Sequence, residues 1–324
     1  MLSIDKKSRT RGGTLPVALS WLGQAVVLFG VLWATDTVPA QAAENYDKAY
    51  TVTGRAHVRV HADDASVHVI TSDSNQVEFH ARSEGAAWGI EFGPRPHVES
   101  HQDGDLVELN AQFNWHFMLI GGSNKSSRIE VRMPRNADLD LDTGDGSVEL
   151  SSLNGNVTVH TSDGGIHATQ VAGSIELHTS DGNITANGLQ GAINLHTSDG
   201  HIRGSDLEGR CEASSSDGSI EVQGRFELLD LHSGDGSITA KVEPGSQVSS
   251  SWNVHTSDGS VHLSLPSDLK ASLDASTGDG RISSQLPVQI EGRMSKHELR
   301  GTLNGGGQSL FVRSGDGPIV LVAL

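Results

Sequence analysis

Residues 160–200 read HTSDGGIHATQVAGSIELHTSDGNITANGLQGAINLHTSDG, and the pentapeptide His-Thr-Ser-Asp-Gly occurs in them three times at intervals of 18 residues. The turn sequence Thr/Ser-Ser/Gly-Asp-Gly continues at this spacing on both sides, with its aspartate at Asp145, Asp163, Asp181, Asp199, Asp217 and Asp235. A glycine follows each of these, at Gly146, Gly164, Gly182, Gly200, Gly218 and Gly236. A fixed period of this length indicates a repeat architecture.

Each 18-residue unit contains two similar halves of nine residues. Glycine recurs every nine residues from Gly146 to Gly218, and an apolar residue stands two positions later, as at Ile166, Ile175 and Ile184. Another apolar or small residue usually follows two positions after that. This period of two predicts short, half-buried strands. Since only four or five residues separate successive strands, no crossover helix fits between them, and each strand must stack on the equivalent strand one coil away.

The sequence therefore predicts an all-β protein, a flattened parallel β-solenoid with 18-residue coils that each hold two strands and two turns. With parallel strands about 4.8 Å apart, the five regular intervals should rise ~24 Å. We divide the chain into residues 1–42, a signal peptide; residues 44–135, a β-rich N-terminal cap region; residues 136–245, the regular repeat; and residues 246–324, longer and irregular coils that end the solenoid.

The first 42 residues resemble a secretory signal. Basic residues between Lys6 and Arg11 precede an almost wholly apolar run from Leu15 to Ala34, and Ala40 and Ala42 supply the small residues of a cleavage site. The run is long for a signal, so an uncleaved membrane anchor is the alternative. We expect an exported protein of the periplasm, the cell surface or the medium, which contacts a membrane only through this segment if it is not cleaved.

The charge of the chain excludes one class of partner. The formal net charge is −17, and the first 42 residues contribute four basic and two acidic groups, so the mature chain would carry −19. Nucleic-acid binding requires a basic surface, and we therefore expect none. The single cysteine, Cys211, lies in an apolar column and should be a small buried hydrophobic residue rather than part of a disulfide or a metal motif.

The turns of the repeat have a chemical explanation in the sequence. Aspartate can accept a hydrogen bond from its own backbone, and glycine allows a positive φ without steric cost, so the Asp-Gly pairs are interpreted as structural turn residues. The threonines of the motif, Thr161, Thr179, Thr197 and Thr256, should point inward, where stacked hydroxyls can bond one another.

Sequences flanking the repeat resemble a known family. Residues 128–134 (Arg-Ile-Glu-Val-Arg-Met-Pro) and 137–141 (Ala-Asp-Leu-Asp-Leu) lead into the first Thr-Gly-Asp-Gly turn, and Gly305-Gly306-Gly307 and Ser314-Gly315-Asp316-Gly317 follow near the other end. With the repeats, these segments make residues 50–324 similar to the bacterial putative-adhesin family built on domain of unknown function 4097. The resemblance implies an exported β-solenoid with no established activity, and no catalytic residues are carried over.

Two columns of side chains are candidates for metal binding. A histidine stands three residues before the aspartate in most coils, at His160, His178, His196, His232 and His255, and stacked imidazoles could share a transition-metal ion. The stacked aspartates could bind calcium, although the Gly-Gly-x-Gly-x-Asp pattern of calcium-binding nonapeptides is missing. Outward polar residues and plain turn residues explain both columns without a ligand, so we predict no cofactor and keep both ions as alternatives.

One aromatic segment is a candidate ligand patch. Phe113, Trp115 and Phe117 alternate and would share one face, where they could bind a sugar or form the core of the N-terminal cap region. The sequence contains no Gly-x-Ser-x-Gly, His-Glu-x-x-His or phosphate-binding loop, and thin coils leave no interior pocket. We therefore expect that the protein is not an enzyme, with a carbohydrate-active enzyme as the remote alternative.

These observations predict a scaffold or adhesin of the cell envelope that presents a repetitive acidic surface to an unknown protein or glycan. Many weak contacts, rather than chemistry, would provide its function. The second hypothesis is a binding module for metal ions or glycans.

Overall fold

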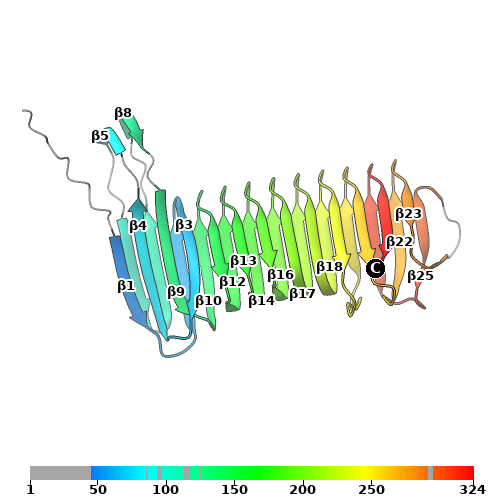
Figure 1. The fold of residues 1–324 in the computed structure, drawn as a ribbon, viewed down its shortest axis with the longest axis horizontal. Coiled ribbons are helices and arrows are strands. Elements are labelled where there is room, and N and C mark those ends of the chain that lie inside the picture. The colour runs from blue at the N-terminus through cyan, green and yellow to red at the C-terminus, as the bar shows by residue number, and fades with distance from the viewer. Residues whose placement is uncertain (1–44, 85–86, 93–96, 113–116, 124–125, 291–294) are drawn as a thin grey trace, which may run out of the picture. The chain divides into compact units, whose positions relative to one another are not determined.

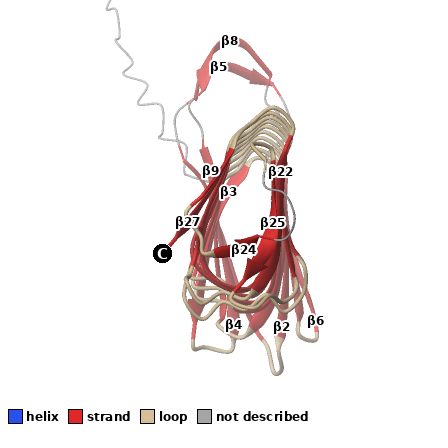
Figure 2. Cartoon of the chain, turned by 90° about the vertical axis from the view of Figure 1, so that its right-hand side faces the viewer, coloured by secondary structure: helices blue, strands red, loops and turns tan. Residues whose placement is uncertain are grey.

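The computed structural model describes residues 45–84, 87–92, 97–112, 117–123, 126–290 and 295–324, and within these residues it contains strands and no helix. The strands wind into a stack of flat coils (Figure 1). Seen along the stack, two sheets form its sides, and turns close its two edges (Figure 2). The edge that carries the Thr/Ser-Ser/Gly-Asp-Gly turns is here named the turn edge, and the opposite one the bend edge.

The two sheets are named face A and face B. Face A contains, in stacking order, β6 (His97–Asp103), β7 (Leu106–Gln112), β2 (Ala56–Ala62), β10 (Ala137–Thr143), β12 (Asn154–Thr161), β14 (Ala172–Thr179), β16 (Gln190–Thr197), the second halves of β17 (Ile202–Ser215) and β18 (Ile220–Ser233), β20 (Trp252–Thr256), β26 (Ser309–Ser314), β22 (Ala271–Thr277), β25 (Glu298–Leu303) and β24 (Val288–Ile290).

Face B contains, in stacking order, β1 (Asn45–Thr51), β4 (Gln76–Glu84), β9 (Ser126–Pro134), β3 (Ala65–Ser72), β11 (Val148–Ser151), β13 (Ile166–Thr169), β15 (Ile184–Asn187), the first halves of β17 and β18, β19 (Ile238–Val242), β21 (Val261–Leu265), β27 (Ile319–Ala323) and β23 (Ile282–Ser284). In the regular part, each strand pairs in parallel with the strand 18 residues later. The predicted parallel β-solenoid with two strands per coil is confirmed.

The core consists of the apolar columns that the half-period predicted. Val157, Ile175 and Ile193 lie in register on face A, and Ile166 and Ile184 on face B, all at most 2% exposed. Cys211 continues the first column and is fully buried, which raises the pKa of its thiol to about 12. The thiol therefore stays protonated at neutral pH and behaves as a small apolar side chain, as expected.

The glycines of the turn edge are needed for a different reason than predicted. None of the six Asp-Gly glycines has a positive φ. Instead each packs directly on the coil beside it, and a Cβ on Gly182 would lie far inside van der Waals contact with the carbonyl oxygen of Gly164. Positive φ occurs on the opposite edge, in the column Ser152, Gln170, Gly188 and Asp206. Close stacking, rather than turn conformation, therefore excludes side chains at the Asp-Gly positions.

The inward threonines are confirmed as buried, but they bond backbone rather than one another. Thr179 Oγ1 donates to the carbonyl oxygens of Ser162 and Gly164, at 3.1 and 3.0 Å, and accepts the N–H of Gly182 at 3.1 Å. Thr197 and Ser215 make the same contacts one and two coils further on. Each hydroxyl thus joins two coils and pairs buried backbone groups of the Asp-Gly glycines, such as the carbonyl oxygen of Gly164 and the N–H of Gly182.

Both ends of the stack depart from winding in chain order. At one end, the coil of β26 and β27 lies between the coil of β20 and β21 and that of β22 and β23, which precede it in sequence (Figure 1). At the other end, the coil of β2 and β3 lies between β7 with β9 and β10 with β11. Winding in chain order would place β27 at the end of the stack, whereas the structure places it one coil further in, between β21 and β23. The three coils at the C-terminal end carry the same turn motif, at Asp258, Asp279 and Asp316, so the motif is compatible with either order of stacking.

Antiparallel strands cover the outermost coils. β4 and β6 pair with β9 and β7, and β1 pairs with β4, at one end, while β25 pairs with β22 at the other. The hydroxyls of Tyr46 and Tyr50 on β1 both contact Ser100 on β6 and so join the two faces across the end. Such strands protect the stack from pairing with the edge strands of other molecules.

A separate two-stranded sheet contains part of the predicted aromatic patch. β5 (Ala87–Phe92) and β8 (Phe117–Ser123) pair only with each other within the described residues. Phe117 begins β8, whereas Phe113 and Trp115 fall outside the described residues, so the ligand patch stays a prediction. Within the same residues, no helix is long and apolar enough to span a membrane.

Candidate functional site

The aspartates of the repeat form an acidic ridge along the turn edge. The ridge comprises Asp145, Asp163, Asp181, Asp199, Asp217 and Asp235, all of which are exposed. Their backbone is fixed by the neighbouring coil, since the N–H groups of Asp181, Asp199 and Asp217 each donate to a serine carbonyl oxygen one coil away, at 3.0 Å. The carboxylates therefore recur at the strand spacing of about 4.8 Å.

Next to Asp145, the acidic ridge adjoins two further aspartates, Asp63 and Asp64. Burial raises the pKa of Asp64, and the nearby charges of Asp145 and Asp63 raise it further. Neighbouring carboxylates oppose one another's ionisation, and a bound cation would relieve that repulsion. Within the part of the chain that the structure describes, however, no three His, Cys, Asp or Glu residues are grouped closely enough to hold a metal ion.

The histidine column forms as predicted, in two stacks on face A. The ring centroids of His160 and His178 lie 4.4 Å apart with planes 6° from parallel, and those of His178 and His196 lie 4.5 Å apart. His196 Nδ1 then hydrogen-bonds Ser214 Oγ at 2.7 Å, which separates this stack from a second one. In the second stack, His232 and His255 lie 5.1 Å apart.

Parallel rings set a limit on metal chemistry. Ring nitrogens lie in the plane of each imidazole, so stacked rings direct their lone pairs side by side instead of toward one point. A tetrahedral site needs ligands that converge at about 2 Å from the ion. Metal binding by the five histidines therefore stays a prediction that would require their side chains to rotate.

The stacks should make stability depend on pH. Burial lowers the pKa of His178, and His160 and His196 lower it further, against the opposing effect of Glu176. Since the folded pKa lies below 6.5, the unfolded chain takes up the proton first, and this contribution to stability is complete above pH 6.5 and is lost as the pH falls through the folded pKa. Burial and His232 likewise lower the pKa of His255.

We expect His178→Gln to weaken that pH dependence. The measurement is the urea midpoint between about pH 7.5 and pH 5, which should fall less in the variant than in the wild type. His262→Gln, at an exposed histidine of face B outside the stacks, is the matched control and should retain the wild-type slope. Equal slopes for all three proteins would show that the stack does not control the acid response.

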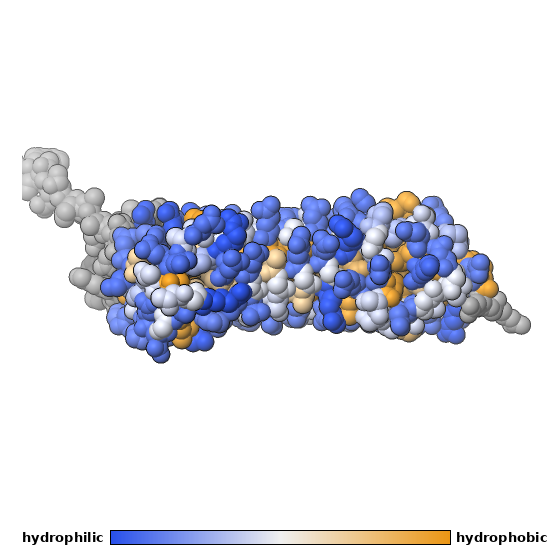
Figure 3. Space-filling view, turned by 90° about the horizontal axis from the view of Figure 1, so that it is seen from below, coloured by the Kyte–Doolittle hydropathy of each residue, from blue (hydrophilic) through white to orange (hydrophobic). Residues whose placement is uncertain are grey.

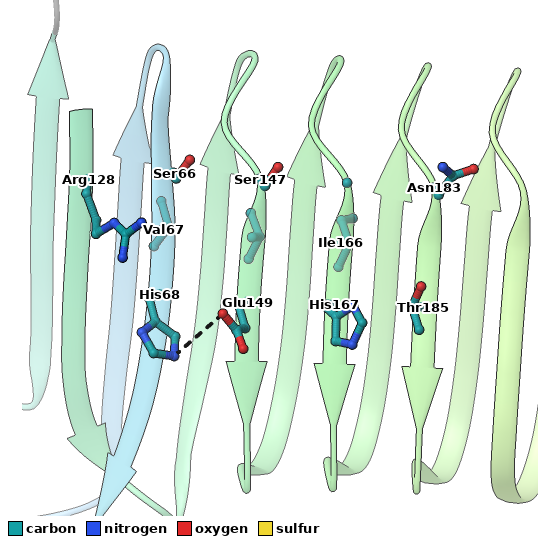
Figure 4. A pocket seen from close by; sticks show the side chains of 12 residues that line it. Ser66, Val67, His68, Arg128, Ser147, Glu149, Ile166, His167, Asn183 and Thr185 are labelled. Atoms are coloured by element: carbon teal, nitrogen blue, oxygen red, sulfur yellow. Dashed lines mark ion pairs between the residues drawn. The ribbon is translucent and has the colours of Figure 1, made fainter. Parts of the chain in front are cut away.

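The outer surface of face B contains a groove that sequence analysis did not identify. Its volume is about 520 Å³, and it crosses the adjacent strands β9, β3, β11, β13 and β15 (Figure 4). A row of small residues, Ser66, Ser147 and Gly165, lies on its turn-edge side. A row of larger residues faces it on the bend-edge side: His68, Glu149, His167 and Thr185.

The two rows follow directly from strand geometry. On each strand, outward residues alternate with the buried Val67, Val148 and Ile166, so two outward positions flank every buried one. The groove exists because one flanking column is small and the other is large. The repeat shows part of this pattern, but the contribution of β3 and β9 depends on a pairing between segments about 60 residues apart, which periodicity does not predict.

The bend edge is mostly polar (Figure 3). Seen onto the bend edge, hydrophilic residues cover most of the molecule, and apolar residues gather toward the end that holds β22 to β27 (Figure 3). Among the described residues, the large apolar side chains most exposed to solvent are Ile290 and Leu324, at 51% and 49%. The structure thus defines a class of protein: a β-solenoid with long polar faces and an acidic ridge.

The chain belongs to the Toastrack DUF4097 family, whose model matches residues 56–321. The predicted family is therefore confirmed. A search of curated proteins found no match.

Several solved structures are similar to the chain at low sequence identity. A putative adhesin from Bacteroides fragilis is 10% identical, with 87% of this chain and 97% of that one covered and a TM-score of 0.35. A putative cell adhesion protein from Clostridium sporogenes is 9% identical, with 87% and 100% covered and a TM-score of 0.23. A putative lipid binding protein from Parabacteroides distasonis is 10% identical, with 85% and 96% covered and a TM-score of 0.33.

Proposed function

We propose that the protein is an exported, non-enzymatic component of the cell envelope that binds other surfaces by many weak contacts. The observation that carries this proposal is the acidic ridge, in which exposed carboxylates repeat on a rigid backbone at the turn edge. Equal spacing lets a partner with repeated basic groups engage several carboxylates at once. The second and later contacts are then intramolecular, so avidity can exceed any single affinity by about a hundredfold or more.

Three further observations support this proposal. The names of the similar solved structures describe adhesion or binding, and the family has the same fold. The net charge of −17 favours basic partners and opposes anionic surfaces. The apolar run before Ala40 and Ala42 supports export, whether or not the segment is removed.

The ridge can be tested without disturbing the turns. In a quadruple variant, Asp163, Asp181, Asp199 and Asp217 are all replaced with asparagine, which keeps the turn-forming side chain but removes four negative charges. Cells that display the wild-type chain should adhere to amine-coated beads and much less to carboxylate-coated beads. Raising the ionic strength from about 0.05 to about 0.5 M should weaken adhesion, because salt screens exposed charges.

A charge-matched control distinguishes the ridge from net charge. The control variant carries Glu176→Gln, Glu212→Gln, Glu221→Gln and Asp268→Asn, which removes four exposed charges scattered over the molecule. We expect the ridge variant to lose adhesion about tenfold and the scattered variant to lose far less. Equal losses in the two variants would show that the ordered ridge is unimportant and only net charge matters.

A further inference from the structure

The groove on face B has the size of a ligand site. Its volume of about 520 Å³ lies within the ~300–1,000 Å³ typical of small-molecule sites. It crosses five parallel strands, whose four intervals of about 4.8 Å give a length of ~19 Å. A ligand that fills it must therefore be long and narrow, and it must lie across the strands.

The lining mixes apolar and polar atoms, and its polar groups can both donate and accept hydrogen bonds. The hydroxyls of Ser66, Ser147 and Thr185 do both, and so does a neutral imidazole, through one nitrogen each. Glu149 lies in the middle of the row of larger residues, with Oε2 3.9 Å from His68 Nε2. Sugar hydroxyls also donate and accept, so they match these polar groups better than a purely apolar ligand would.

Charge distinguishes between classes of oligosaccharide. Glu149 projects at the centre of the groove (Figure 4), and Glu130 lies beside His68 on the end strand β9. Arg128 lies only at one end of the groove (Figure 4). In a chain with a net charge of −17, the central carboxylate of Glu149 would repel a polyanion, so the lining favours an uncharged oligosaccharide.

The ends of the row of small residues fix the extent of the groove. Asn183 closes one end, where its Oδ1 accepts the N–H of His201 at 2.7 Å, and His201 Nδ1 accepts the N–H of Ser219 at 3.0 Å. Beyond Asn183, side chains in this row therefore bond the next coil. Between Arg128 and Asn183 the row contains two serines and a glycine, and it leaves space at the surface.

We propose that this groove binds a linear, uncharged oligosaccharide of several hexoses that lies across β9, β3, β11, β13 and β15. The strand spacing is close to the repeat length of an extended hexose chain, so successive sugars meet successive strands. This inference names a ligand for a protein proposed to act by surface binding and rests on that proposal. The ridge variants and the groove variants alter different residues, so either idea can fail alone.

Gly165 allows a direct test, because it lies outside the recurring glycine series and has space beside it. A Cβ there would meet only the carbonyl oxygen of Asn183, at 3.4 Å, so Gly165→Tyr should fill the groove without disturbing the coil. Ser219→Tyr places the same ring in the same row outside the groove and is the matched control. His167→Ala removes a lining side chain without filling the space.

The probes are cellohexaose, chitohexaose and maltohexaose, with a hexamer of galacturonic acid as the anionic comparison, each titrated into the full chain by calorimetry. We expect at least one neutral hexamer to bind with a Kd below about 1 mM and to bind more tightly than its dimer. Gly165→Tyr should weaken binding by about tenfold or more, His167→Ala should weaken it less, and Ser219→Tyr should leave it unchanged.

Three results would overturn the proposal: no binding of any neutral hexamer, binding of the uronic-acid hexamer alone, or wild-type affinity in Gly165→Tyr. Urea unfolding of each variant separates loss of the groove from loss of the fold. If Gly165→Tyr unfolds, the test is the comparison of sugar binding by His167→Ala, which should be weakened, with binding by Ser219→Tyr, which should not. Neither of these two positions is buried.

Discussion

Replacement of Gly182 with valine is expected to destabilise the protein by about 3 kcal/mol, at the upper end of the range for overpacked positions. The new Cβ would overlap the carbonyl oxygen of Gly164, and that atom belongs to backbone held by the next coil. Its hydrogen bond with Thr179 Oγ1 prevents it from moving aside freely. The two coils would have to separate, and the backbone pairing on both sides of the turn would weaken.

The measurement is the urea midpoint, interpreted together with the slope of the transition, because repeat proteins can lose cooperativity. Gly165→Val is the matched control in the same segment, since its Cβ has ordinary space and its φ is not positive. It should change the stability by less than about 1 kcal/mol. If both valines cost the same, loss of glycine flexibility rather than close stacking would explain the effect.

Deletion of residues 309–324 is expected to unfold more of the chain than the deleted residues. These residues form β26 and β27, and Leu310, Val312, Ile319 and Leu321 are buried between two coils. Burial of each such side chain stabilises the fold by about 2 kcal/mol, so losing four of them lowers the free energy of unfolding by on the order of 8 kcal/mol. β22 and β23 would also lose their parallel partners, so residues 271–303 should lose their structure as well.

Amide hydrogen exchange gives the readout for this deletion. Protection should disappear throughout β22, β23 and β25 and remain in β12 to β17, because contacts in a solenoid reach only neighbouring coils. Deletion of Ala323 and Leu324, which are exposed, is the control and should preserve protection of β22. The coil of β26 and β27, which lies between the coils of β20 and β22, is here named the inserted coil. Full protection of β22 after the larger deletion would mean that β22 pairs directly with β20 and that the inserted coil is dispensable.

The repeat itself could be predicted from sequence because its signals are local. An 18-residue period, a half-period of nine and alternating apolar residues determine strand position, core columns and the stacking of each strand on its equivalent. The histidine stack and the acidic ridge follow from the same register, as His178 on His160 shows. These features required no knowledge of contacts between distant segments.

The features that sequence analysis missed depend on distances between coils. The cause of the Asp-Gly preference lies in the approach of Gly182 to Gly164, not in the conformation of one turn. The position of the inserted coil was missed because Asp258, Asp279 and Asp316 mark similar turns. The turn motif therefore does not determine the order in which these coils stack. The groove was missed because Ser66 and Arg128 join it through pairing outside the repeat.

The inserted coil also determines the order in which this end of the protein can fold during synthesis. β22 is made about 40 residues before β26, yet β26 must lie between β22 and β20. While the polypeptide is being translated, this part of the protein cannot assemble vectorially, and pairing of nascent β22 directly with β20 would be a kinetic trap. Such long-range closure slows folding, so this end of the stack should be the last part of the chain to reach its native pairing.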